Sequence, residues 1–162
     1  MVVFLLRVKA ELENVTNLRP GVGMSWCLDF KHPQSDETRE KVVVSPDETV
    51  EVKGSKGVCN LTLRWPESKR EGNITVCTGD IKGKKAAKPF TEEDGDYVTW
   101  AAFECRGAEP VKWHQLESLS CDSTEGKAFD EVDLTEDDWC DYDDENDLSV
   151  GVSNIEYVIE RA

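Results

Sequence analysis

Apolar and polar residues alternate along much of this chain, and a period of two is typical of β-strands that bury one face. Between residues 6 and 12, apolar side chains at the even positions alternate with Arg7, Lys9 and Glu11. Further alternating or β-branched apolar runs are found at 26–30, 42–44, 50–52, 59–63, 74–76, 97–105 and 150–159. The pattern therefore predicts eight or nine short strands.

Turn-forming residues separate these runs. We expect a turn over 17–23, where Pro20-Gly21 ends the first strand, and a second turn over 54–57. A linker that contains Lys and Gly is predicted over 78–91. Many short strands without a long helical period favour a mainly β fold, either a two-sheet β-sandwich or a partly open, barrel-like arrangement with little helix. A length of 162 residues fits one domain, 1–162.

The charge balance excludes several classes of partner. Acidic residues outnumber basic ones 34 to 19, which gives a formal net charge of −15. Nucleic acid and anionic membrane surfaces both need clustered Lys and Arg, so we expect neither as a partner. Arg7 breaks the apolar start before it reaches the length of a signal-peptide core, and no apolar run is long enough to span a membrane. We therefore expect a cytoplasmic protein whose six cysteines are reduced.

The acidity is concentrated in residues 130–147, which hold eleven acidic residues and no Lys or Arg. Apolar and aromatic residues are interspersed, so we expect this segment to pack on the β core with its carboxylates outward. Residues 136–139 favour one short turn of helix. We do not expect a calcium-binding EF-hand loop, because Asn146 replaces the loop Gly and Val152 stands where the bidentate Glu belongs.

Two interpretations of the acidic segment remain open. One is a solvated acidic face, and the other is a docking surface for a basic protein. The candidate contact residues are Asp137, Asp138, Trp139, Tyr142, Asp143 and Asp144.

Support for catalysis is thin, since no nucleophile elbow, zinc-protease motif or phosphate-binding loop occurs. The two histidines are His32 and His114, and a surface or structural role is the simpler interpretation of His114. Cys105 precedes Arg106, which would lower a thiol pKa if the two side chains met. Neighbours in a strand point to opposite faces, so a buried strand cysteine is the simpler interpretation. The six cysteines contain no pair at the spacing of a zinc knuckle.

Three long blocks, at 8–20, 102–113 and 128–152, resemble the eukaryotic "CXXC motif containing zinc binding protein" family in the same order. The resemblance extends over essentially the whole chain. It implies a β-sandwich with barrel-like features, in which two CxxC pairs on neighbouring hairpin tips bind one zinc ion. The biochemical activity of that family is unknown, so the resemblance implies no reaction.

Alignment with that family places its four zinc ligands at His32, Ser35, Trp65 and Ser68. Four cysteine thiolates form a closed tetrahedral zinc site, whereas one imidazole, two hydroxyls and an indole do not. We therefore predict that zinc is absent and that Trp65 and His32 fill the space of the former metal site. A weak or relocated zinc site is the alternative.

Taken together, these features favour a non-enzymatic, cytoplasmic, monomeric β-domain that binds another protein of unknown identity. No cofactor is expected. The alternatives are a zinc-binding protein with a weak or relocated site and a thiol-dependent redox protein or enzyme that uses Cys105.

Overall fold

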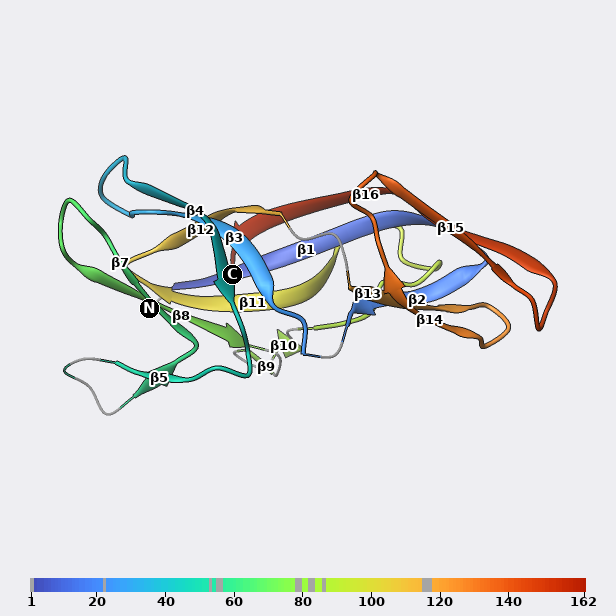
Figure 1. Cartoon of the computed structure of the whole chain (residues 1–162), viewed down its shortest axis with the longest axis horizontal. Helices are drawn as coiled ribbons and strands as arrows, with labels where there is room; N and C mark the ends of the chain where they lie inside the picture. Colours follow the sequence, from blue (N-terminus) through green and yellow to red (C-terminus); the bar gives the residue numbers. More distant parts are fainter. Residues whose placement is uncertain are drawn as a thin grey trace.

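A computed structural model describes residues 2–21, 23–52, 54, 57–77, 80–81, 84–85, 87–114 and 118–162. Every regular element among these residues is a β-strand, and the mainly β fold expected from the alternation is confirmed (Figure 1). None of the described residues belongs to a helix, so no helix that could cross a membrane is found among them.

A six-stranded antiparallel sheet forms the frame of the molecule. Its strand order is β15 (Asp138–Asp143), β16 (Leu148–Arg161), β1 (Val2–Glu13), β11 (Val98–Arg106), β8 (Glu71–Cys77) and β7 (Leu61–Arg64). The long strands β1 and β16 lie side by side, so the start and end of the chain meet at one end of the molecule (Figure 1).

A β-bulge interrupts the pairing of β1 with β11. The register passes from Leu6 opposite Ala101 to Arg7 opposite Thr99, which leaves Trp100 as the extra residue. Trp100 and Ala101 are both buried, although neighbouring residues in a regular strand face opposite sides. The bulge therefore allows β11 to bury consecutive side chains, which strict alternation would not predict.

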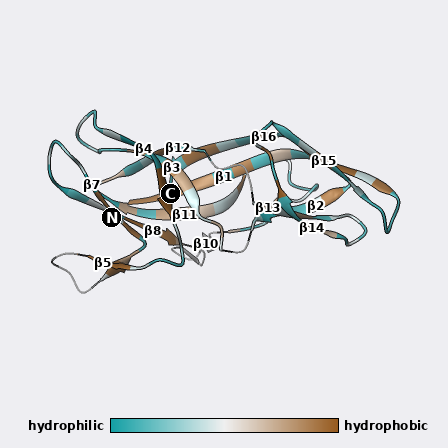
Figure 2. Cartoon of the chain, viewed as in Figure 1, coloured by the Kyte–Doolittle hydropathy of each residue, from teal (hydrophilic) through white to brown (hydrophobic). Residues whose placement is uncertain are grey.

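Four smaller sheets pack around this frame. They are β12 (Glu109–Trp113) with β3 (Trp26–Lys31) and β4 (Thr38–Val44); β14 (Ala128–Val132) with β13 (Leu119–Ser123) and β2 (Val15–Pro20); β5 (Val50–Glu51) with β6 (Val58–Cys59); and β9 (Asp80–Ile81) with β10 (Lys84–Lys85). Hydrophobic residues concentrate on strands such as β3 and β8, while the loops that join β3 to β4 and β7 to β8 are hydrophilic (Figure 2).

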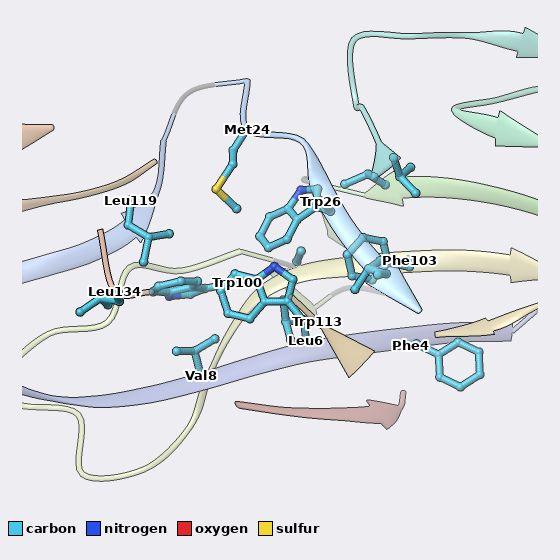
Figure 3. Packing of buried hydrophobic residues seen from close by; sticks show 14 of the residues in the cluster. Phe4, Leu6, Val8, Met24, Trp26, Trp100, Phe103, Trp113, Leu119 and Leu134 are labelled. Atoms are coloured by element: carbon cyan, nitrogen blue, oxygen red, sulfur yellow. The ribbon is translucent and has the colours of Figure 1, made fainter. Parts of the chain in front are cut away.

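Aromatic side chains join the β12–β3–β4 sheet to the large sheet. Trp26 of β3 meets Phe103 of β11 edge to face, with ring centroids 5.8 Å apart. Trp113 of β12 lies 5.8 Å from Trp26 and 6.2 Å from Trp100 (Figure 3). Such tilted and edge-to-face pairs are favourable beyond the area that they bury. The core between the two sheets is therefore built around a cluster of indoles.

The turn predicted over 17–23 is wrong for most of its length. Residues Val15–Pro20 form strand β2, which pairs with β13, and the chain turns only at Gly21. Leu18 is buried, and its amide and carbonyl both exchange 2.8 Å hydrogen bonds with Phe90. The strand was missed because only every third residue of β2 is fully buried, so its sequence does not alternate.

Two further local predictions differ from the structure. The helical turn expected at 136–139 is absent: Asp137 has φ of 75° and donates its amide to the Leu134 carbonyl, 3.1 Å away, in a tight turn before β15. The linker predicted over 78–91 falls partly outside the described residues. Its described part contains β9, β10 and the bridge from Phe90 to Leu18.

We expect Leu28→Ala to destabilise the protein by about 2–5 kcal/mol, because Leu28 is fully buried between the two sheets and its loss leaves a cavity. Val43→Ala in the neighbouring strand is the matched control, since Val43 is 56% exposed and its truncation should cost less than about 0.5 kcal/mol. Urea unfolding of both variants checks this, and equal losses would contradict the sheet-packing assignment.

Candidate functional site

Two loops lie at the end of the molecule where the chain begins and ends (Figure 1). The β3–β4 loop, residues 32–37, is closed by the hydrogen bond from the His32 amide to the Glu37 carbonyl, 2.9 Å. The β7–β8 loop, residues 65–70, is closed in the same way by the Trp65 amide and the Arg70 carbonyl, also 2.9 Å. We refer to both loops together as the loop pair.

The two loops bind each other directly. The Glu67 amide donates to the Glu37 carboxylate across a distance of 3.2 Å. The Arg39 guanidinium donates to the Arg64 carbonyl at 3.0 Å. Each contact crosses from one hairpin to the other, so the loop pair forms one unit.

Trp65 fills the junction of the loop pair. Its side chain is only 1% exposed, and its indole N–H donates to the Gly107 carbonyl at 2.8 Å. The His32 ring meets the indole edge to face at 5.3 Å between centroids. This contact brings Trp65 against the opposite loop. Gly107 has φ of 71° in the turn between β11 and β12, a conformation that favours glycine.

The other three residues aligned with zinc ligands bind the backbone of their own loops. His32 Nδ1 accepts from the Gln34 amide at 3.0 Å, and Ser35 Oγ accepts from the Glu37 amide at 3.3 Å. Ser68 Oγ accepts from the Arg70 amide at 3.4 Å. These are short-range turn contacts of the kind that Ser and His side chains commonly make.

A pocket of about 390 Å³ opens beside the loop pair. Phe4 of β1, the Trp65 indole and Ala108 give it an apolar wall, and three arginines also line it. No sequence motif indicated this pocket, because its residues come from separate strands and loops that only the fold brings together.

Three of the six thiols, those of Cys77, Cys105 and Cys121, offer little nucleophilic character. Cys105 is 2% exposed, and burial raises its pKa to about 12. Burial likewise raises the pKa of Cys121 to about 12. The pKa of Cys77 is raised to about 11, mainly by burial. Reactive cysteines need a lowered pKa and access to solvent. The interpretation of Cys105 as a buried strand cysteine is therefore confirmed.

His114 forms a pair with a carboxylate on the outer face of the β12–β3–β4 sheet. Its Nε2 lies 2.6 Å from Asp29 Oδ1, which also accepts the Lys41 amide at 2.9 Å. Burial raises the pKa of Asp29, but the hydrogen bonds from Lys41 and His114 outweigh it and hold the pKa below its usual value. Within the described residues no hydroxyl or thiol is hydrogen-bonded to this imidazole, so the pair lacks a nucleophile.

The acidic segment 130–147 lies at the opposite end of the long axis from the loop pair (Figure 1). Within this segment, Val132 and Leu134 are buried, as is Phe129 just before it. Trp139 is half-buried against Phe129, with ring centroids 5.4 Å apart. Tyr142 is 45% exposed, and its hydroxyl donates a hydrogen bond to the Asp147 carboxylate.

Asp143 does not belong to the exposed acidic surface, and its prediction as a contact residue is wrong. Its side chain is fully buried, where its oxygens accept from Ser123 Oγ at 2.7 Å and from the Asn146 side chain at 2.9 Å. The amides of Glu145 and Asn146 also donate to it, at 3.1 and 3.2 Å. Burial raises the pKa of Asp143, but these hydrogen bonds together lower it below the usual value. Asp143 therefore anchors the turn between β15 and β16.

The remaining predicted contact residues do reach the surface. Asp137 and Asp138 are exposed at the start of β15. Asp144 is 75% exposed and forms an ion pair with Lys127 at 2.5 Å. Asp138 and Tyr142 lie on one face of β15, and Trp139 lies on the other face, because alternate residues of the regularly paired strand point to opposite sides.

Comparison with known proteins gives matches along the whole chain. The family described as "CXXC motif containing zinc binding protein, eukaryotic" matches residues 5–160. The CXXC motif containing zinc binding protein of Xenopus laevis is 33% identical over 161 residues, which are 97% of each chain. The human protein of that name is 34% identical over 154 residues, 93% of this chain and 92% of the relative.

Two solved structures share the fold. The crystal structure of C1orf123 has a TM-score of 0.88 and 30% identity, and the match covers 99% of both chains. A hypothetical protein from Plasmodium falciparum has a TM-score of 0.86 and 28% identity, over 99% of this chain and 100% of that one.

The names of the Xenopus laevis and human relatives imply a bound zinc ion. The side chains at the loop pair of this chain do not fit such an ion. Structural zinc is held by thiolates and imidazoles, whereas an indole N–H is a hydrogen-bond donor with no lone pair to offer. The Trp65 N–H is already bound to Gly107, and His32 Nδ1 to Gln34. Among the described residues, no three His, Cys, Asp or Glu side chains are grouped to hold a metal ion.

We expect Trp65→Ala to lower the free energy of unfolding by about 3–5 kcal/mol, because a buried indole and its hydrogen bond are lost together. Trp65→Phe keeps most of the packing and should lose about 0.5–1.5 kcal/mol with the hydrogen bond to Gly107. Denaturant unfolding separates the two variants. A loss below about 1 kcal/mol for Trp65→Ala would show that the indole does not hold the loop pair together.

Asp143→Asn should lower stability near neutral pH, and its deficit relative to the parent protein should shrink as the pH falls below about 4. The pKa of Asp143 is lower in the folded protein than in the unfolded chain. Its contribution to the free energy of unfolding is therefore fully present above the unfolded-state pKa and is lost as the pH falls through the folded-state pKa. Asp141→Asn on the same strand is exposed and serves as the control. Thermal unfolding between neutral and acidic pH checks this, and a pH-independent deficit would contradict it.

Proposed function

We propose that this chain, which belongs to the eukaryotic CXXC motif containing zinc binding protein family as its three sequence blocks predicted, acts by binding a basic protein through its acidic end. The contact surface consists of Asp137, Asp138, Trp139, Tyr142 and Asp144, and we call it the acidic face. In this proposal the protein acts as a cytoplasmic monomer, without zinc and without catalysing a reaction.

The observation that supports this best is an exposed aromatic side chain among carboxylates. Tyr142 is 45% exposed on the same face of β15 as the exposed Asp138, and Asp144 is exposed in the turn that follows. Aromatic residues supply much of the binding energy at protein interfaces, and surrounding charges select and steer the partner. In the described part of the chain, the cation bound to this face is Lys127, which pairs with Asp144.

The backbone at this end also supports a protein contact. β15 is the last strand of the six-stranded sheet, so one of its edges has no neighbouring strand in that sheet. Edge strands offer free amide and carbonyl groups to a partner, and charged side chains there limit unspecific pairing. A basic, extended segment of the partner would form hydrogen bonds with the free edge of β15 and ion pairs with the carboxylates beside it.

The competing thiol-based enzyme gains no support from the site. Cys105 is buried with a pKa of about 12, and Arg106 beside it in sequence is exposed on β11. A weak zinc site using His32 is likewise unsupported, because its Nδ1 is bound to Gln34 and its ring to Trp65.

We expect charge reversal on the acidic face, Asp138→Lys with Asp144→Lys, to raise the Kd for the partner at least about tenfold. Glu48→Lys with Glu93→Lys is the matched control, since it changes the net charge equally at exposed positions elsewhere. Quantitative pull-down with the parent and both variants identifies proteins lost only from the first variant, and titration with the purified partner then gives the Kd. Partners retained equally by all three proteins would contradict the proposal.

A further inference from the structure

The pocket beside the loop pair combines an apolar wall with an unusual concentration of positive charge. Arg70, Arg106 and Arg161 line it, from the start of β8 and the ends of β11 and β16. Glu71 and Glu109 are its acidic residues. Its ionised side chains therefore carry a net charge of +1, in a protein whose net charge is −15.

The three guanidinium groups have no counter-ion among the residues that the structure describes. Within the described part of the chain, none of them forms an ion pair, a hydrogen bond or a cation–π contact through its side chain. Other arginines are engaged: Arg7 pairs with Glu160 at 3.0 Å, and Arg19 with Asp122 at 3.3 Å. The chain contains 34 acidic residues. A shortage of carboxylates therefore does not explain why these three arginines lack an ion-pair partner among the described residues.

The shape and the wall of the pocket define what would bind there. A volume of about 390 Å³ lies in the range of small-molecule sites. Val2, Phe4 and Ala108 provide apolar contacts next to the Trp65 indole. Guanidinium groups bind carboxylates and phosphates through two parallel hydrogen bonds, and they bind them more strongly than neutral groups.

We propose that this pocket binds a small organic oxyanion, in which an apolar body lies against Phe4 and Trp65 and a carboxylate or phosphate group lies among the three arginines. The site is separate from the acidic face, which lies at the other end of the molecule (Figure 1). The pocket also depends on Trp65, which stands at a position where the family has a cysteine, because the Trp65 indole forms part of the pocket wall. The two binding events are therefore independent, and either proposal can fail without the other.

Titration of the full-length protein with three naphthalene derivatives tests the proposal. The probes are 1-naphthoate, 1-naphthyl phosphate and the neutral 1-naphthalenemethanol. The readout is the NMR signal of the Trp65 indole N–H, which Trp65→Phe identifies, together with the Gly107 amide; the Trp139 indole at the far end is the internal control. We expect at least one anion to shift the first two signals and to bind about tenfold more tightly than the alcohol. The stronger anion then identifies the oxyanion class.

Single substitutions then locate the charge. Arg106→Gln and Arg161→Gln should each raise the Kd of the preferred anion about tenfold. Arg64→Gln is the matched control, since Arg64 is exposed at the same end but does not line the pocket, and its Kd should stay unchanged. Equal binding of the neutral alcohol, an equal effect of Arg64→Gln, or no shift with either anion up to about 10 mM would each overturn the proposal.

Discussion

The hydrogen bond between the Trp65 indole and the Gly107 carbonyl joins parts of the chain that are distant in sequence. The indole comes from the β7–β8 loop, its acceptor from the β11–β12 turn, and its ring neighbour His32 from the β3–β4 loop. Burial of one large side chain thus connects the edge of the six-stranded sheet to the β12–β3–β4 sheet.

The two ends of the molecule differ in chemistry because they are built differently. At the loop pair, short turns bind their own polar groups beside an apolar pocket that three arginines line. At the other end, the β15–β16 hairpin buries one carboxylate, that of Asp143, and exposes the others around Tyr142. The long antiparallel strands β1 and β16 run between these ends, so the same sheet carries both surfaces.

The sequence predicted those parts of the fold where one face of a strand is buried. Residues at 6–12, 26–30 and 150–159 alternate clearly and are strands in the structure. β2 and β15 were missed because their charged and polar residues do not alternate, and pairing with neighbours distant in sequence decides their conformation. Tertiary context overrides local pattern at such edges.

The candidate site was predictable only in part. Alignment indicated that Trp65 and His32 would meet, since the resemblance placed both at hairpin tips that are neighbours in the family. It could not reveal that Asp143 is buried, because eleven acidic residues in one segment look alike in sequence and only hydrogen-bond geometry distinguishes them. The arginine pocket likewise depends on residues 70, 106 and 161, which no spacing rule connects.

We expect the Trp65 side chain, and no metal ion, to hold the loop pair together. Elemental analysis of tag-free protein after exhaustive dialysis tests this, with the human relative purified in parallel as a zinc-binding reference. We predict that this chain retains no stoichiometric zinc. Retention of about one zinc ion per chain would show that a metal ion is bound instead.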